Sequence, residues 1–422
     1  MILNLLNQTA ELRRFATLCC LMLVFFSIPL STSGLDIFLV PSLILILLTP
    51  EYWQKLKIAC TQPWFVFICI FFTYACLACL WSQATPHAQG VVIGKYVKLL
   101  YLPILAVGFT QVDIRQKAIH AFMAAMVVIC CIAWIKWLHL IKFHGDDNGY
   151  IFKNHIITGY MMDLAAYLAL AAWIKSNAKY RIVYACLFLL YSYHVLFIGT
   201  GRMAYLIYFL MIFIFIVQYF SWKKTIAGLL FVFTLSLGAF YLSPAIQLGF
   251  ENTQKELIAY QQNEKNTSLG YRFQFHQFAH ELFSRHPWMG SGTSGFSDAF
   301  EKEKPVPEWG PTLFEPHSQY WLIAVDFGVI GLVILSLLFI GLFAGSAQLK
   351  ETGRFAVAFL VSFLCACTSD SFLLYSGTGY LLVLFMSICF GEGLSEPLPA
   401  ARVVKLPGWV LHRLFRNKPG IA

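Results

Sequence analysis

Two arginines stand where a guanidinium could bind an anion. Arg202 follows the short turn Gly199-Thr200-Gly201 and begins an apolar stretch, so we expect it at the start of a helix. A cation there opposes the helix dipole by about 0.3–1 kcal/mol, whereas a bound anion would reverse that sign and accept two hydrogen bonds. Arg272 begins an amphipathic stretch. The alternatives are an Arg202 that merely reaches towards solvent and an ordinary solvated Arg272.

His317 is the residue best suited to accept a proton. It follows Pro316 and precedes a strongly apolar stretch, so we expect it in the first turn of a helix. The positive end of the helix dipole would lower the pKa of His317 and leave the imidazole neutral at pH 7. Such a side chain could act as a general base. The alternative is a histidine with a structural role at the boundary of an apolar helix.

Lys95 and Lys98 lie one helical turn apart in another apolar stretch. They could bind phosphate oxygens as point charges. They could equally pair with Asp36 or Asp163, and the sequence does not favour either reading.

The remaining polar groups predict structure rather than chemistry. We interpret Asp163, Asp326 and Asp370 as partners between helices rather than as catalysts. The stretch Gly145-Asp146-Asp147-Asn148-Gly149 is typical of a polar turn, with an acidic metal site as the alternative. The sequence has no phosphate-binding loop, no nicotinamide fingerprint and no H-E-x-x-H motif, so cytoplasmic ATP is not indicated as an energy source.

Composition shows which elements must position these residues. Of the 422 residues, 59% are hydrophobic and 12% are charged, against about 25% charged in soluble domains. This excludes an ordinary soluble protein. We interpret the net charge of +9 as orientation charge rather than as a sign of nucleic-acid binding, because the basic residues lie beside apolar stretches. The twelve cysteines all lie in or next to apolar stretches, so they predict neither disulfides nor a zinc site.

The apolar stretches predict an all-α, polytopic membrane helix bundle of about twelve transmembrane helices. The expected spans are Phe15–Leu30, Leu35–Leu48, Trp64–Trp81, Val91–Phe109, Ala118–Ile141, Ile156–Ile174, Ile182–Ile198, Met203–Phe220, Thr225–Leu242, Ser318–Phe343, Phe355–Tyr375 and Gly379–Phe390. Basic residues fall in alternate connections, from Arg13-Arg14 to the C-terminal tail, so both ends of the chain should lie on the inner side.

One long connection, from Ser243 to Pro316, should then lie on the outer side. Within it an apolar stripe recurs with helical spacing and predicts an amphipathic helix on the membrane or on the bundle: Phe275, Phe278, Ala279, Leu282 and Phe283. The stretch from His286 to Pro316 is rich in proline and glycine and should be irregular. We therefore divide the chain into nine transmembrane helices (1–242), an outer loop (243–316), three further transmembrane helices (317–392) and a basic cytoplasmic tail (393–422).

Several short motifs occur together in a recognisable order. They are Gly199-Thr200-Gly201-Arg202, Tyr271-Arg272-Phe273, Arg285-His286-Pro287-Trp288-Met289-Gly290-Ser291-Gly292, Pro316-His317-Ser318-Gln319-Tyr320-Trp321-Leu322 and Asp326-Phe327-Gly328-Val329-Ile330-Gly331-Leu332. In this order and topology the chain resembles the O-antigen ligase/polymerase superfamily of bacterial membrane glycosyltransferases. The likeness runs from about His155 to Leu332, and the earlier spans match only in hydropathy. Ser318 stands where members of the superfamily often have asparagine.

The resemblance implies transfer of a glycan from undecaprenyl pyrophosphate to an acceptor hydroxyl on the periplasmic face of the bacterial inner membrane. Arg202 and Arg272 would hold the pyrophosphate, and His317 would act as the base. Pyrophosphate is a good leaving group, so the resemblance implies no metal and no cofactor, and a single inverting displacement.

Within the superfamily we rank the lipopolysaccharide O-antigen ligase first, with lipid A-core as acceptor. That acceptor is strongly anionic, and the chain offers spare outer cations: Lys95, Lys98, Lys142 and Lys153. The O-antigen polymerase is the first alternative. A protein O-oligosaccharyltransferase is less favoured, because such members usually carry an additional C-terminal region. A transporter of lipid-linked glycan is less favoured too, because Arg202, Arg272 and His317 gather at one face.

Overall fold

The computed structural model describes residues 2–140 and 151–395, and every regular element in these ranges is a helix. The expected polar turn at 145–149, Lys142 and the basic tail beyond residue 395 lie outside the described residues. The α-helices are α1 (Ile2–Ser27), α2 (Thr32–Leu47), α3 (Trp53–Cys60), α4 (Pro63–Leu77), α5 (Pro86–Tyr96), α6 (Leu102–Gly108), α7 (Val112–Trp137), α8 (His155–Lys175), α9 (Ala178–Tyr193), α10 (Arg202–Tyr219), α11 (Trp222–Leu242), α12 (Pro244–Gln261), α13 (Ser268–Arg285), α14 (Gly295–Glu303), α15 (Gln319–Ser346), α16 (Gly353–Ala366) and α17 (Ser376–Gly393). Short 3₁₀ or π turns connect some of them: η1 (Pro50–Tyr52), η2 (Ala78–Leu80), η3 (Val97–Tyr101) and η4 (His194–Ile198).

The polytopic helix bundle predicted from the sequence is confirmed, but the number of spans is smaller. Among the described residues, 8 helices are long and apolar enough to cross a membrane, or 9 if α2 and the helix after it form one span bent by 81°. One reason is that the expected span Phe355–Tyr375 is helical only as far as Ala366. The nine residues that follow, Cys367 to Tyr375, form an irregular connection that returns into the bundle.

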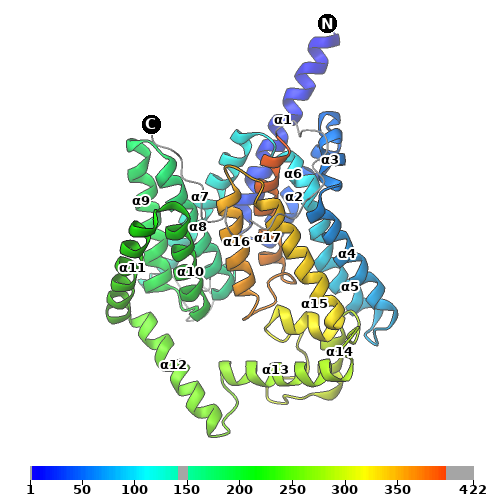
Figure 1. Cartoon of the computed structure of the whole chain (residues 1–422), viewed down its shortest axis with the longest axis vertical. Helices are drawn as coiled ribbons and strands as arrows, with labels where there is room; N and C mark the ends of the chain where they lie inside the picture. The colour runs from blue at the N-terminus through cyan, green and yellow to red at the C-terminus, as the bar shows by residue number, and fades with distance from the viewer. Residues whose placement is uncertain (1, 141–150, 396–422) are drawn as a thin grey trace.

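The long connection between α11 and α15 forms a helical layer at one end of the bundle, and α1 begins at the opposite end (Figure 1). It contains the expected amphipathic helix as α13, whose Phe275, Phe278, Ala279 and Leu282 are buried. This apolar face packs against α15, so the helix lies on the bundle. The expectation of an irregular stretch after His286 is wrong in part, because Gly295–Glu303 forms the helix α14.

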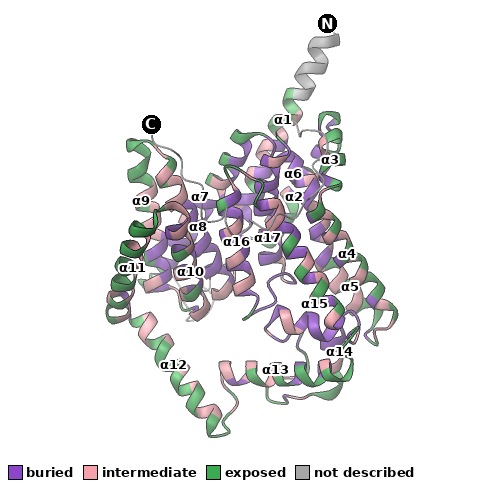
Figure 2. Cartoon of the chain, in the orientation of Figure 1, coloured by how far each residue is buried: buried purple, intermediate pink, exposed green. Residues whose placement is uncertain are grey.

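The core runs through the middle of the bundle, where α15, α16 and α17 are largely buried, whereas α11 lies at the periphery (Figure 2). Only Ala239 of α11 is buried, and its other side chains leave a surface of exposed leucine and phenylalanine. An apolar helix whose side chains are mostly exposed is typical of a lipid-facing span.

Two of the recognised motifs contact each other through their backbones. The amides of Ser291 and Gly292 donate to the carbonyls of Val325 and Asp326, at 2.8 and 2.9 Å. The helix α15 is interrupted at this point by Gly328, which has a φ of 66°. Because a side chain strains a residue in that conformation, glycine is required there. The contact fixes the layer against the helix that follows His317.

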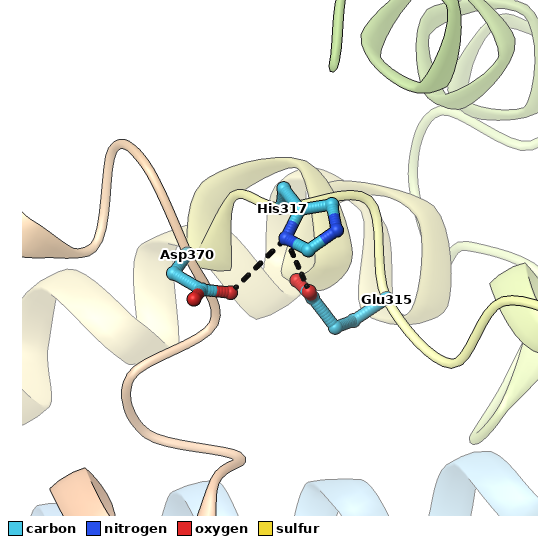
Figure 3. A group of neighbouring side chains, drawn as sticks. All are labelled: Glu315, His317 and Asp370. Carbon is cyan, nitrogen blue, oxygen red and sulfur yellow. Dashed lines mark hydrogen bonds and ion pairs between the residues drawn. The ribbon is translucent and has the colours of Figure 1, made fainter. Parts of the chain in front are cut away.

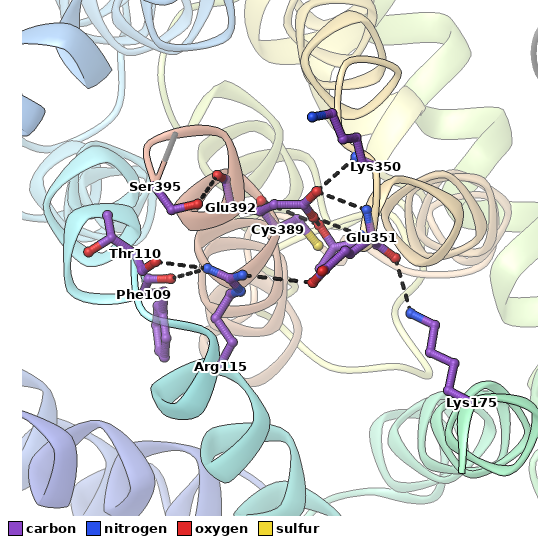
Figure 4. Close-up of polar contacts among 10 residues, drawn as sticks. Phe109, Thr110, Arg115, Lys175, Lys350, Glu351, Cys389, Glu392 and Ser395 are labelled. Carbon is purple, nitrogen blue, oxygen red and sulfur yellow. Dashed lines mark hydrogen bonds and ion pairs between the residues drawn. The ribbon is translucent and has the colours of Figure 1, made fainter. Parts of the chain in front are cut away.

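At the end of the bundle away from α12–α14, a polar clasp joins three helices (Figure 4). The Glu392 carboxylate at the end of α17 accepts backbone N–H groups of Lys350, Glu351 and Thr352 at 2.7–2.8 Å. The guanidinium of Arg115 on α7 donates to two backbone carbonyls and lies 3.9 Å from Glu351. These bonds hold the turn between α15 and α16, so they stabilise the frame that carries the loop after α16.

Candidate active site

A histidine between two buried carboxylates forms the centre of the candidate site. Nδ1 of His317 lies 3.1 Å from Glu315 Oε1 and 3.4 Å from Asp370 Oδ1, while Nε2 lies on the other side of the ring (Figure 3). Glu315 and Asp370 are each only 2% exposed, whereas the imidazole is 22% exposed. An imidazole that donates Nδ1–H to a carboxylate keeps Nε2 free to accept a proton.

Hydroxyl donors hold the Glu315 carboxylate in place. Ser371 Oγ donates to Glu315 Oε2 at 2.6 Å, and the Tyr375 hydroxyl donates to Oε1 at 2.9 Å. The amide of Ser371 also donates to Asp370 Oδ1 at 3.1 Å. Asp370, Ser371 and Tyr375 all belong to the irregular connection after α16, so this connection provides most of the partners of Glu315 and His317.

Lys95 and Lys98 support the same connection. The ammonium of Lys98 is buried and donates to the carbonyls of Leu374 and Tyr375 at 3.1 and 2.9 Å. Lys95 donates to Ser376 Oγ at 3.0 Å. These bonds direct both amino groups at the protein backbone and at a serine. The role of Lys95 and Lys98 as phosphate ligands therefore stays a prediction, and the geometry gives them a positioning role.

His317 precedes its helix, so the expectation that it lies in the first turn is wrong. Ser318 is the N-cap of α15, and its hydroxyl accepts from the amide of Trp321. His317 has a φ of 53°, in the left-handed region that favours glycine. The cost of this conformation is offset by the ring contacts and hydrogen bonds that the imidazole makes only in this position.

The expected lowering of the His317 pKa is wrong as well. Burial lowers the pKa of His317, but the hydrogen bond to Asp370 and the charges of Glu315 and Asp370 outweigh it, so the pKa is raised above its ordinary value. Burial and the charge of Asp370 raise the pKa of Glu315 to about 7. The helix dipole is a smaller effect here than two carboxylates within hydrogen-bonding distance of the ring.

Arg272 lies on α13, close enough for its charge to lower the pKa of His317. Among the described residues its guanidinium has no ion-pair partner. The same helix provides Phe275, whose ring stacks on the imidazole with centroids 5.8 Å apart. The structure thus places Arg272 near His317, and their roles as an anion-binding group and a base stay predictions.

Arg202 begins α10, as expected, and its guanidinium is already paired. Two of its nitrogens contact the Glu256 carboxylate at 3.0 and 3.3 Å, and one also donates to Thr253 Oγ1 at 3.0 Å. Glu256 Oε2 accepts from the amide of Leu269 as well, at 3.1 Å. Leu269 is in the first turn of α13, three residues before Arg272, so Glu256 joins Arg202 to the helix that carries the second arginine.

The Glu256 carboxylate thus occupies a site built for an anion. It lies between a guanidinium that donates two hydrogen bonds and the amino end of a helix, where backbone N–H groups point outward. Phosphate oxygens bind to this combination of groups in the same way as carboxylate oxygens.

The other acids that the sequence singled out lie away from this centre. Asp326 accepts from the amides of Ser294 and Phe296 at 3.2 and 2.9 Å, and it thereby caps α14. Asp163 is buried in α8, and neither of its oxygens has a hydrogen-bond partner among the described residues. The expected pairing of Asp163 with another helix is therefore not seen.

The cluster of Glu315, His317 and Asp370 offers one nitrogen and two carboxylate oxygens within 4.8 Å of one another, a spacing that a divalent cation could bridge. The carboxylates already accept from the Ser371 and Tyr375 hydroxyls and from a backbone amide. A cation would compete for the same lone pairs, so we interpret the cluster as a site that holds a proton.

Glu315, Tyr375 and Ser371 were not predicted as site residues, and Asp370 was expected to have a structural role. The only available signal was the polar run Thr368-Ser369-Asp370-Ser371 inside an expected span. Such a run in apolar surroundings indicates a break in a helix.

The fold and the site define a polytopic, all-helical membrane protein with a histidine–carboxylate centre beneath a helical layer at one end of the bundle. Residues 185–336 match the family described as O-antigen ligase, so the resemblance to this family is confirmed over that range. The range contains Arg202, Arg272 and His317. An uncharacterized protein of Haemophilus influenzae is 24% identical over 312 residues, which cover 69% of this chain and 77% of that protein.

Proposed function

We propose that this protein transfers O-antigen glycan from undecaprenyl pyrophosphate to a hydroxyl of lipid A-core on the periplasmic face of the bacterial inner membrane. The observation that carries this proposal is the His317 imidazole, held by Glu315 and Asp370 near Arg272, which has no ion-pair partner among the described residues. His317, Glu315 and Arg272 lie within residues 185–336, which match the O-antigen ligase family. Both substrates are bound to lipid. A site at one end of a membrane bundle is accessible to both.

In the proposed reaction, His317 Nε2 accepts the proton of the acceptor hydroxyl as its oxygen attacks the anomeric carbon of the donor sugar. A new C–O bond forms there while the bond from that carbon to the pyrophosphate oxygen breaks, so the configuration is inverted. Undecaprenyl pyrophosphate leaves as an anion. The His317 proton then passes to bulk water, which restores the base.

Arg272 and Arg202 stabilise the negative charge that develops on the leaving pyrophosphate. Among the described residues the Arg272 guanidinium has no ion-pair partner, and the two Arg202 nitrogens become available once the donor substrate has displaced Glu256. The same displacement releases the Leu269 amide, which gives the pyrophosphate a further hydrogen-bond donor at the amino end of α13. No chemical step in this scheme requires a metal ion.

The ligase is preferred to the O-antigen polymerase on the description of the matched family. Lys95 and Lys98 hold the connection after α16, which leaves Lys153 as the described lysine that could attract the anionic acceptor. The long outer loop and both ends of the chain inside remain our proposal for the topology, with α1 and the α12–α14 layer at opposite ends in support.

Product analysis separates the two reactions. Purified protein in liposomes is given the lipid-linked glycan and lipid A-core, without nucleotide and with a chelator. The proposal expects glycan attached to lipid A-core, detected by mass spectrometry. A product in which the glycan on the polyprenyl carrier becomes longer, with lipid A-core unmodified, would identify a polymerase instead.

A further inference from the structure

Next to His317 an indole ring faces solvent without an evident structural need. Trp309 is 42% exposed, although its ring also contacts Phe275 and Tyr271 of α13, with centroids 5.1 Å apart in both cases. Its centroid lies 6.3 Å from that of the His317 imidazole. In this cluster of aromatic rings, Phe275 is therefore buried and Trp309 is partly exposed to solvent.

The backbone that carries this indole is held in a tight turn. The amides of Trp309 and Gly310 donate to the carbonyls of Val306 and Pro307 at 3.1 and 3.2 Å, which closes a tight turn. Pro307 and Pro311 restrict the backbone on either side. An exposed tryptophan on a fixed turn loses little further conformational freedom when a ligand binds, so it is well suited to form a binding surface.

We propose that Trp309 is the platform of a sugar subsite, on which the acceptor saccharide stacks with its ring while one hydroxyl points to His317. This rests on the proposed function, in which Nε2 of His317 accepts a proton from the acceptor. A hydroxyl that donates to Nε2 does so at about 2.8 Å. Its sugar ring must then lie within a few ångströms of the imidazole, and the partly exposed indole of Trp309 has its centroid 6.3 Å from that ring.

The surroundings favour a saccharide over a lipid chain. A pyranose has a face of C–H groups that packs on an aromatic ring and a rim of hydroxyls that need polar partners. Trp309 offers the flat face, and the charged groups of Arg272 and Glu308 lie on the same helix–loop unit. A lipid chain would leave those polar groups without partners.

The test measures KM separately for donor and acceptor with the full chain in liposomes. Trp309→Phe keeps a flat ring, Trp309→Leu keeps apolar volume without one, and Trp309→Ala removes both. We expect Trp309→Leu and Trp309→Ala to raise the acceptor KM about tenfold, the equivalent of one lost stacking contact, with the donor KM unchanged. Trp309→Phe should remain near wild type.

Trp288→Ala is the matched control. Its indole is 70% exposed and lies on the same outer layer, but it has no ring contact with His317 among the described residues. The acceptor KM of this variant should not change. Saturation transfer from aromatic protons to a delipidated core oligosaccharide should be seen in the wild type and in Trp288→Ala, and it should be lost in Trp309→Leu.

Three results would overturn the subsite. An acceptor KM that is the same in the wild type, Trp309→Leu and Trp309→Ala excludes it, as does a loss confined to Trp309→Ala, which indicates packing alone. A change only in binding to liposomes would make Trp309 a lipid anchor. In all three cases the wild type still transfers glycan. If the wild type transfers none to any acceptor, the proposed function fails and the subsite with it.

Discussion

Replacing Asp370 with asparagine tests how the histidine is tuned. His317 must be neutral to accept a proton, and Asp370 helps to raise its pKa against the effect of burial. The rate of transfer by the wild type should therefore rise with pH, and the midpoint of this rising limb of the pH–rate profile should lie above the ordinary histidine pKa of about 6.5. Glu315, with a pKa of about 7, titrates over the same range and contributes to that limb. Asp370→Asn removes a negative charge and weakens the bond that raises the His317 pKa, so the limb should move to lower pH.

The loss of rate at high pH can be estimated from the geometry. A hydrogen bond to a charged group contributes about 1.5–3 kcal/mol. The Asp370 contact is 3.4 Å long, beyond the usual range for N–H···O bonds, so the lower figure applies. About 1.5 kcal/mol corresponds to about a tenfold lower kcat on the plateau. Glu315 remains 3.1 Å from the same nitrogen and keeps the ring oriented, so the loss should stay well below that of His317→Ala.

The assay is the initial rate of transfer from pH 5.5 to 9 in liposomes, with both substrates saturating. Asp298→Asn is the control, because among the described residues the Asp298 carboxylate pairs with Lys302 on α14, and its loss should leave the profile unchanged. A limb that moves to higher pH in Asp370→Asn, or one that stays where it is, would refute our account of the His317 environment.

Three further predictions concern the residues around this centre. Glu256→Gln removes the carboxylate that competes with the donor for Arg202, so the donor KM should fall by about three- to tenfold. Glu251→Gln is the control: Glu251 also lies on α12 but forms an exposed pair with Lys255, so the donor KM should not change. A higher donor KM in Glu256→Gln would mean that Glu256 positions Arg202 instead. Lys98→Met removes the Lys98 hydrogen bond to the Leu374 carbonyl and one of the two hydrogen bonds that the Tyr375 carbonyl accepts, so kcat should fall at least tenfold while the donor KM stays constant. A selective rise in donor KM would restore Lys98 as a phosphate ligand. Glu392→Gln weakens the clasp at the end of the bundle away from α12–α14 and should lower the unfolding free energy by about 2 kcal/mol. The variant should show a lower Tm in detergent, with the KM values for donor and acceptor unchanged. An unaltered Tm would contradict the role of the clasp.

The sequence predicted the features that depend on local pattern. The order of apolar helices, the buried face of α13 and the position of Arg202 at the start of α10 all follow from periodicity and turn chemistry. These features depend only on residues that lie within a few helical turns of one another in the sequence, so a single sequence is enough to predict them.

The features that the sequence could not predict depend on contacts between distant residues. Asp370 is 53 residues from His317, and Lys98 is 276 residues from Leu374. Hydropathy treats Phe355–Tyr375 as one span because the apolar residues around Asp370 outweigh the polar run. The predicted direction of the His317 pKa shift was wrong for the same reason. The helix dipole is a local effect, whereas the Asp370 carboxylate that raises the pKa comes from another part of the chain.

The rate of transfer in His317→Ala tests the central claim most directly. Wild type, His317→Ala and His280→Ala are compared in the same liposomes with saturating donor and acceptor; His280 is an exposed histidine on α13. Our account predicts that His317→Ala lowers kcat by about 10²- to 10⁴-fold, the usual contribution of a general base, and that His280→Ala stays near wild type. A His317→Ala protein that is correctly folded and transfers glycan at the wild-type rate would contradict it.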